Sequence, residues 1–336
     1  MRGDIRGDGT SRRAFLGAAS ATAASLAVTV GNRRAAKAAA AKPSRSTVRD
    51  HLWIFTVPAG LDNDSLETGN YRGGSRMTPA EGAFYLDIPN LLFIRSNDLP
   101  RLPTHNQQWR AKTSFEQYAI SFRPLDRVIW SVVGSGGKGG MSELHYVLSL
   151  AEKFPNIRGI YLDDFIIDRK RQPDGRIVGR PASSPSELES ARKRLDALGR
   201  PMDMWVTLYS HELLPKHPRY VGCAPPLARV LEWFDVLTLW TWNSKELPQL
   251  EESLAALESI APKNCRIALG MYVWDFYNAR PVPVELMQHQ CEWGLKWLKA
   301  KRVHELIFLA NTLLDVGLPS VEFSRNWIAK VGGQPV

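Results

Sequence analysis

The chain has 336 residues, of which 44% are hydrophobic, and it carries a formal net charge of +9. Residues 1–49 contain ten Lys or Arg and two acidic residues, so that only +1 belongs to the remainder. The basic character therefore describes the N-terminal segment alone, and the remainder lacks the positive charge expected of a nucleic-acid-binding protein.

The N-terminal segment has the features of a targeting signal. Arg12 and Arg13 stand before Phe15, and a weakly apolar, alanine-rich stretch leads to a run of small residues at 35–41. This arrangement resembles a bacterial twin-arginine export signal. The resemblance implies that residues 1–45 are signal and linker, that the twin-arginine machinery is a partner, and that the protein is periplasmic or extracellular. A basic nucleic-acid-binding arm and a retained anchor are the alternatives.

The remaining residues, 46–336, show a repeated pattern of eight short β-branched and aromatic runs. The runs are nearly continuously apolar, as expected of parallel strands that helices cover on both faces. They are 51–57, 83–89, 127–134, 157–164, 202–210, 234–242, 266–274 and 305–312. Eight such units predict a single α/β domain with the (β/α)8 TIM-barrel fold; a doubly wound open sheet is the rival. No run reaches the ~18 apolar residues of a membrane span.

Helix start signals separate several of these runs. Ser184, Pro185 and Glu187 predict a helix that ends before Gly199, because they supply a capping hydroxyl, a proline at the first position and a glutamate at the third. Residues 243–246 repeat the start signal, and a further helix is expected after Pro283.

The barrel prediction indicates where a functional site lies, because active sites of this fold occupy the C-terminal ends of the strands. The polar and aromatic residues at those ends are Asp163, Asp164, Tyr209, His211, Glu212, Trp240, Trp242, Asn243, Tyr272, Trp274, Asp275 and Asn311. Carboxylates, amides and tryptophans gathered at one mouth are typical of a sugar-binding site.

The fourth run carries a local resemblance to barrel glycoside hydrolases. In the α-amylase type, a Gly-x-Arg-x-Asp pattern presents the nucleophile, and the matching positions here are Gly159, Tyr161 and Asp163. The aspartate is kept and the arginine is not. In the chitinase type the catalytic glutamate falls at Phe165, so a chitinase mechanism is disfavoured. Because adjacent residues of a strand face opposite sides, only one of Asp163 and Asp164 is expected to face the barrel axis, and the spacing favours Asp163.

Glycoside hydrolysis needs two carboxyl groups. By position, the resemblance to the α-amylase type makes Glu212 the acid/base candidate and Asp275 a stabiliser of the transition state. Asp87, in the second run, is the reserve carboxylate. Each of these residues also has a structural interpretation, as a loop residue or a helix start.

Aromatic and polar residues at the strand ends are the candidate substrate contacts. Trp242 and Trp274 are expected to stack on a sugar ring, and the other candidates for contact are Tyr209, His211, Trp240, Asn243, Tyr272 and Asn311. Other tryptophans, Trp53 and Trp205 among them, are expected in the core beneath the outer helices.

Two further patterns are weighed and set aside. Residues 134–139 match the G-x-G-x-x-G spacing of dinucleotide-binding turns, but they follow the third run of the domain, whereas such turns normally follow the first strand. His211, Glu212 and His217 suggest a metal, but Pro215 breaks the helix that a zinc motif would use. We therefore predict no cofactor and no metal.

The sequence thus predicts an exported protein of the glycoside hydrolase type, acting on a carbohydrate with Asp163 or Asp164 as the central carboxylate. A non-catalytic carbohydrate-binding or cell-surface barrel protein is the main alternative, because a fold does not settle an activity. An exported nicotinamide-dependent oxidoreductase is the third.

Overall fold

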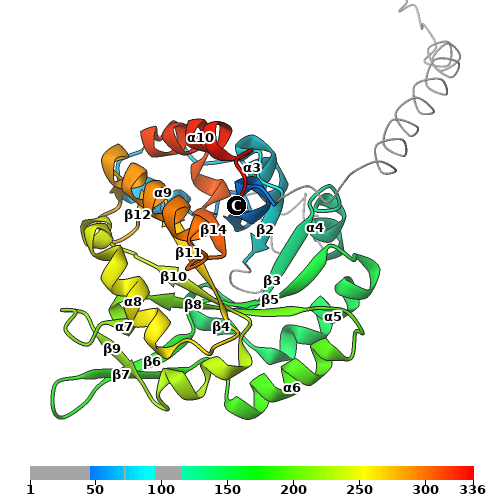
Figure 1. Cartoon of the computed structure of the whole chain (residues 1–336), viewed down its shortest axis with the longest axis vertical. Helices are drawn as coiled ribbons and strands as arrows, with labels where there is room; N and C mark the ends of the chain where they lie inside the picture. Colours follow the sequence, from blue (N-terminus) through cyan, green and yellow to red (C-terminus); the bar gives the residue numbers. More distant parts are fainter. Residues whose placement is uncertain (1–45, 72, 95–114) are drawn as a thin grey trace, which may run out of the picture. The chain divides into compact units, whose positions relative to one another are not determined.

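The computed structural model describes residues 46–71, 73–94 and 115–336, in which eight parallel strands form a closed barrel (Figure 1). Pairing of β2 with β3 completes the ring. The strands are β1 (Leu52–Thr56), β2 (Asn90–Phe93), β3 (Arg127–Gly134), β5 (Ile157–Leu162), β8 (Asp203–Tyr209), β10 (Val236–Trp240), β11 (Arg266–Tyr272) and β14 (Glu305–Leu309). The predicted (β/α)8 TIM barrel is confirmed, and the open sheet is excluded. The export signal predicted over residues 1–45 lies outside the described residues.

Helices surround the strands (Figure 1). The α-helices are α2 (Asn63–Thr68), α3 (Pro79–Leu86), α4 (Phe115–Ser121), α5 (Leu144–Lys153), α6 (Pro185–Asp196), α7 (Ser210–Leu213), α8 (Leu250–Ile260), α9 (Val284–Lys299) and α10 (Pro319–Val331). The 3-10 helices are η1 (Val48–His51), η3 (Ser135–Gly137), η4 (Met141–Glu143), η5 (Leu227–Arg229), η6 (Leu231–Trp233), η7 (Ser244–Gln249) and η8 (Asn311–Leu313). Ser184 caps α6 as predicted, with Glu187 completing the capping box. The start signal at 243–246 begins η7, which contains Pro248, and α8 follows it.

Short strands lie outside the ring. They are β4 (Lys138–Gly139), β6 (Ile166–Arg171), β7 (Ile177–Pro181), β9 (Val221–Cys223), β12 (Trp274–Asp275) and β13 (Arg280–Pro281). β6 and β7 form an antiparallel hairpin in the long loop after β5, and β9 extends it to three strands. This accessory sheet stands beside the C-terminal end of β5.

The second predicted strand is wrong. Residues 83–89 were expected to be a strand, but the apolar run belongs to α3, which Thr78 and Glu81 start with a capping box around Pro79. Asp87, the reserve carboxylate, is the C-cap of α3 and pairs with Arg49. Since Asp87 precedes β2, it lies at the N-terminal end of the barrel, away from the mouth.

Aromatic side chains fill the barrel interior. Trp53 of β1 and Trp205 of β8 come from strands that are not neighbours, and their ring centroids lie 4.9 Å apart. One layer nearer the mouth, Phe55 contacts Trp240 at 5.6 Å. The prediction that Trp53 and Trp205 lie beneath outer helices is therefore wrong, because the pleat turns them toward the axis. The interior is a packed core and not a channel.

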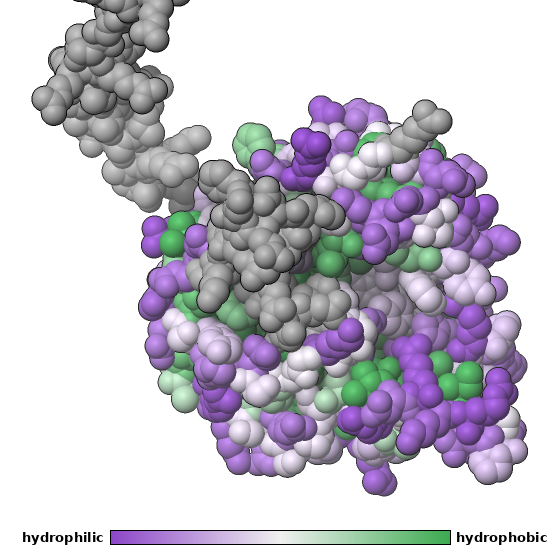
Figure 2. Space-filling model, turned by 180° about the vertical axis from the view of Figure 1, so that it is seen from behind, coloured by the Kyte–Doolittle hydropathy of each residue, from purple (hydrophilic) through white to green (hydrophobic). Residues whose placement is uncertain are grey.

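Hydrophilic side chains predominate on the face shown in Figure 2, where hydrophobic residues form smaller, separate groups. Within residues 46–71, 73–94 and 115–336, no helix combines the length and the apolarity needed to cross a bilayer.

A buried charge lies at the N-terminal end of the barrel. Glu305, at the start of β14, is 2% exposed. It accepts a hydrogen bond from Trp53 Nε1 at 2.7 Å and one from Arg127 Nη1 at 3.1 Å, and Arg266 Nη1 lies 3.7 Å away. The carboxylate thus ties β1, β3, β11 and β14 together opposite the mouth.

We expect Glu305→Ala to lower the free energy of unfolding by about 2–4 kcal/mol. This is somewhat less than the cost of removing one partner from a fully buried ion pair, because Arg127 and Arg266 are partly exposed. Glu322→Ala on α10, whose partner Arg325 is also exposed, should change stability by less than about 0.5 kcal/mol. Urea unfolding of the two variants measures the difference. Equal effects would show that Glu305 contributes little.

Candidate active site

The C-terminal ends of the barrel strands surround a small central pocket of about 170 Å³. Its lining combines carboxylates with phenols and apolar rings. The residues are Phe55, Val57, Leu61, Asp62, Ser135, Asp163, Asp164, Tyr209, Trp240, Trp242, Tyr272, Phe276 and Leu309. The strand-end prediction therefore leads to a real cavity that carboxylates line.

Asp163 lies at the floor of the central pocket, directly after β5. Its side chain is buried, and Thr207 Oγ1 donates to Asp163 Oδ1 at 2.9 Å. Burial, followed by the negative charge of Asp164, raises the pKa of Asp163 well above its usual range. The hydrogen bond from Thr207 opposes this shift and does not cancel it. Asp163 is therefore a carboxyl group that holds its proton more tightly than an exposed aspartate does.

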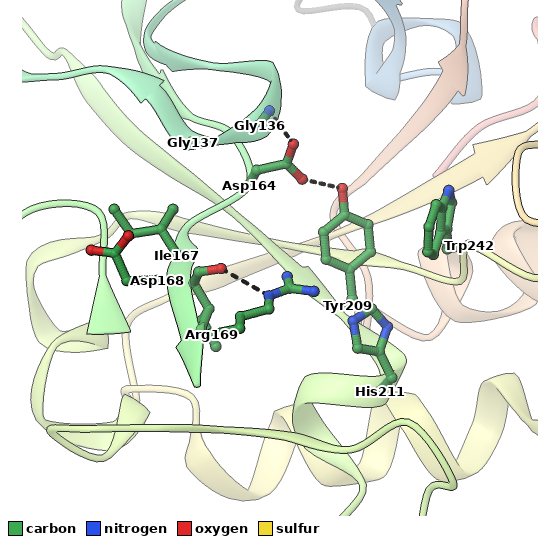
Figure 3. Close-up of a pocket in the computed structure, with 10 residues that line it drawn as sticks. Gly136, Gly137, Asp164, Ile167, Asp168, Arg169, Tyr209, His211 and Trp242 are labelled. Carbon is green, nitrogen blue, oxygen red and sulfur yellow. Dashed lines mark hydrogen bonds between the residues drawn. The ribbon is translucent and has the colours of Figure 1, made fainter. Parts of the chain in front are cut away.

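Asp164 lines the same pocket, although it neighbours Asp163 in the sequence. β5 ends at Leu162, and Asp164 adopts a left-handed backbone conformation with φ of 43°. The alternation of a strand therefore no longer applies, and the expectation that only one of the two aspartates faces the axis is wrong. Tyr209 Oη donates to Asp164 Oδ1 at 2.6 Å, and the Gly136 backbone N–H donates to Oδ2 at 2.5 Å (Figure 3).

Buried phenols support the two aspartates. Tyr161 Oη lies 2.8 Å from Thr207 Oγ1 and accepts a hydrogen bond from Trp240 Nε1 at 3.1 Å. Burial is the main reason that the pKa values of Tyr161, Tyr209 and Tyr272 are raised, so all three remain neutral donors. Hydrogen bonds thus connect Trp240, Tyr161 and Thr207 to Asp163.

Asp62 is a site residue that the sequence analysis missed. It follows β1, lines the central pocket and accepts a hydrogen bond from the Thr312 hydroxyl. Burial raises the pKa of Asp62 more than this hydrogen bond lowers it. A signal was available: the loop after the first apolar run carries two carboxylates, Asp62 and Asp64.

Glu212 and Asp275, the two predicted partner carboxylates, are held by structural hydrogen bonds. Glu212 Oε2 accepts the Tyr209 backbone N–H at 2.9 Å, and Oε1 accepts Arg169 Nη2 at 3.0 Å. Asp275 is fully buried and accepts bonds from the Ser244 and Asn278 backbone N–H groups at 3.1 and 2.9 Å. Neither carboxylate is among the residues that line the central pocket. Their predicted catalytic roles stay predictions.

The predicted substrate contacts divide into two groups. Tyr209, Trp240, Trp242 and Tyr272 line the central pocket, with Trp242 partly exposed at the rim. His211 lines a second, outer pocket, and Asn243, Trp274 and Asn311 are engaged within the protein.

Trp274 is one of the engaged residues: it is fully buried and donates to Ser65 Oγ at 3.0 Å. Asn243 accepts the Lys245 N–H as the cap of η7. Asn311 is fully buried and holds the end of β1 by bonding both the N–H and the C=O of Val57. The mouth therefore brings some of the predicted contacts together and uses the rest as scaffold.

An outer pocket of about 580 Å³ opens beside the central one, between the β6–β7 hairpin and the mouth (Figure 3). It shares Asp164, Tyr209 and Trp242 with the central pocket. The full lining is Gly136, Gly137, Asp164, Ile166, Ile167, Asp168, Arg169, Tyr209, His211 and Trp242.

The glycine-rich turn after β3 is part of this outer pocket. It forms η3 and β4, which pairs back antiparallel with β3. A side chain on Gly137 would collide with Ile167, because a Cβ atom would lie 2.2 Å from its Cγ2. The turn therefore packs closely against the hairpin, and the Gly136 N–H is directed to Asp164.

His211 lies beneath Tyr209, with ring centroids 5.3 Å apart in a stacked arrangement. Burial, together with the positive charges of Arg169, Arg219 and His217, lowers the pKa of His211 to about 3. Its imidazole is thus neutral at ordinary pH. Within the part of the chain that the structure describes, no group of three or more His, Cys, Asp or Glu residues is arranged to hold a metal ion.

No protein-family model matches the sequence, and no curated protein matches it either. Similar solved structures share the fold at low identity. A protein assigned as an α-L-fucosidase from Bacteroides thetaiotaomicron has a TM-score of 0.52 and 10% identity, over 88% of this chain and 98% of that one. The chain has the barrel fold of that structure.

Two further solved structures are similar to this chain. Active domain 2 of a chitinase from Pyrococcus furiosus has a TM-score of 0.48 and 12% identity, over 87% and 99% of the two chains. The catalytic domain of a β-amylase from Paenibacillus polymyxa has a TM-score of 0.46 and 10% identity, over 85% and 100%.

The pH dependence of stability tests the environment of Glu212. Burial raises its pKa from 4.5 to about 7, against the lowering effects of the Tyr209 N–H and Arg169. The folded protein then keeps a proton that the unfolded chain releases between these values, so the free energy of unfolding falls as pH rises from about 4.5 to 7. Relative to Glu212→Gln, we expect a fall of roughly 2–4 kcal/mol across this window.

Chemical denaturation of both proteins at a series of pH values measures this difference. A difference that stays constant or rises with pH would show instead that Arg169 keeps Glu212 ionised in the folded state.

Proposed function

We propose that the protein is an exported glycoside hydrolase that acts on a carbohydrate at the mouth of the barrel. The observation that carries the proposal is the central pocket, where Asp62, Asp163 and Asp164 line one cavity in different hydrogen-bonding environments, with Trp242 at its rim. Hydrolysis of a glycosidic bond requires two carboxyl groups in different protonation states. The fold similarity to a protein assigned as a fucosidase agrees with this proposal.

Asp164 is proposed as the ionised carboxylate that acts as nucleophile or as base for water. Its two oxygens accept hydrogen bonds from Tyr209 and Gly136, an arrangement that suits a negative charge held in a fixed orientation. Asp62 and Asp163, whose pKa values burial raises, supply a protonated carboxyl group. Asp62 projects from the loop after β1 and Asp164 from the end of β5, so a sugar in the pocket has a carboxyl group on either side.

Trp242 is proposed as the stacking platform for the sugar. The ring is partly exposed at the rim of both pockets, next to Tyr277 at a centroid distance of 5.7 Å. An indole face packs well on the C–H face of a pyranose. In this proposal Glu212 and Asp275 keep the loops in place, and the second carboxyl group comes from Asp62.

Hydrolysis is tested by screening the full-length protein against polysaccharides and aryl glycosides and then comparing aspartate variants. We expect Asp164→Asn to lower kcat by a factor of about 10²–10⁴ with binding nearly unchanged, because the substitution keeps the shape and removes the charge. Asp62→Asn and Asp163→Asn should also lower kcat. Asp87→Asn, at the opposite end of the barrel, is the control and should leave activity unchanged.

Turnover that persists in all three pocket variants would refute the catalytic assignment. Binding that depends on Trp242 without any hydrolysis across the panel would establish a carbohydrate-binding protein instead.

Export is proposed to depend on Arg12 and Arg13. Changing both to lysine should leave folded protein in the cytoplasm, because the twin-arginine pathway requires the arginine pair. Changing Arg33 and Arg34 to lysine is the matched control, since it alters a second arginine pair in the same segment. Cell fractionation with immunodetection measures both. Equal export of the two variants would exclude the twin-arginine route.

A further inference from the structure

The outer pocket is continuous with the central one, and its lining includes a positively charged side chain. Asp164, Tyr209 and Trp242 belong to both linings, so a ligand seated in the central pocket has a continuous surface on which to extend. Arg169, from β6, is the positively charged residue of this lining. The chemistry of the extension therefore depends on what surrounds its guanidinium group.

Hydrogen bonds hold the Arg169 guanidinium in place on one side. Nε donates to the Ile166 carbonyl at 3.1 Å, and Nη2 donates to Glu212 Oε1 at 3.0 Å. Nη1 has no hydrogen-bond partner among residues 46–71, 73–94 and 115–336, and the side chain is 37% exposed. Figure 3 shows the guanidinium extending toward Tyr209 and His211. Arg169 is thus oriented in advance and has N–H groups left to donate.

The acidic side chains in and around the outer pocket do not fully occupy the Arg169 guanidinium, so its positive charge remains available to a ligand. Both oxygens of Asp164 already accept hydrogen bonds, from Tyr209 and Gly136. Asp168 points away from Tyr209 in Figure 3 and pairs with Arg180 at 2.7 Å. Glu212, behind Arg169, is the remaining acidic contact, and its raised pKa of about 7 weakens its negative charge near neutral pH.

The His211 ring adds a neutral polar wall. Its Nδ1 is buried without a hydrogen-bond partner in the described part of the chain. The positive charges of Arg169, Arg219 and His217 contribute to its lowered pKa. Arg169 thus supplies a positive charge in the same pocket as this neutral ring, which favours an anionic group there.

We propose that the outer pocket binds the carboxylate of an acidic sugar unit, with Arg169 as its partner and Trp242 against the ring of the sugar. A carboxylate matches the planar guanidinium and its remaining N–H donors. This inference rests on the proposed action on carbohydrates and narrows the substrate class to polysaccharides that contain uronic acids.

The test compares acidic polymers with their neutral counterparts. The full-length chain is titrated with polygalacturonate and with alginate, each beside its own carboxyl-reduced form, and Kd is measured by calorimetry. At least one acidic polymer should bind about tenfold or more tightly than its reduced form. Arg169→Gln should weaken binding of that polymer by about 10- to 100-fold, the range for loss of a charged hydrogen bond, and leave the reduced form within about twofold.

Two further variants control for charge and folding. Arg176→Gln, in the turn of the same hairpin, pairs with Asp174 and lies outside the pocket lining, so it should bind as the unchanged protein does. Arg169→Lys, which keeps the charge, should retain more of the binding than Arg169→Gln. If neither Arg169 variant folds, competition decides: the free uronic acid from which the bound polymer is built should displace that polymer, and sulfate or phosphate at equal concentration should not.

Equal binding of acidic and reduced polymers, or an Arg169→Gln variant that binds the acidic polymer normally, would overturn this inference and leave the proposed hydrolase standing. Displacement by sulfate or phosphate would show a general anion site and would also overturn it. Failure of the chain to bind any carbohydrate would overturn the proposed function as well.

Discussion

The packed interior of the closed barrel is the constraint on which the rest of the structure depends. Trp53 meets Trp205 across the axis, and Phe55 meets Trp240 one layer higher, so aromatic rings block the barrel below the mouth. Since all eight strands are parallel, their C-terminal ends share one rim. A ligand reaches the strand-end residues from that rim alone. Asp163, which directly follows β5 and lines the central pocket, therefore lies at this rim.

Burial and hydrogen bonding act in opposite directions on the carboxyl groups of this pocket. For Asp62 and Asp163 burial is the larger effect, and the pKa of each is raised although a threonine hydroxyl donates to it. Asp164 instead receives one phenol and one backbone donor. Burial thus makes Asp62 and Asp163 better able to keep a proton, and such effects of the surroundings are how paired carboxylates divide acid and base roles.

The strands whose apolar runs are covered on both faces were predictable within a few residues, because two-sided burial leaves little room for another pattern. The second run was wrongly predicted as a strand because it is as apolar as the others. Thr78, Pro79 and Glu81 start a helix there, so local capping determines the structure of this run. For the site, the strand-end rule located Asp163, Tyr209 and Tyr272 at the mouth. Past the end of a strand the alternation of side chains stops, so the same rule gave no guidance on Trp274 and Asn311, which turn into the scaffold.

Asp164 shows why such orientations escape sequence reasoning. Its left-handed conformation costs an L-residue about 1 kcal/mol, and two elements far apart in the sequence support it, the turn after β3 through Gly136 and the end of β8 through Tyr209. Residues held in this way concentrate at functional sites. The turn after β3 depends on Gly137, because a Cβ atom there would collide with Ile167 of the β6–β7 hairpin. Of the glycines that match a dinucleotide-binding spacing, Gly136 and Gly139 adopt positive φ values that favour glycine, and Gly136 directs its N–H at Asp164.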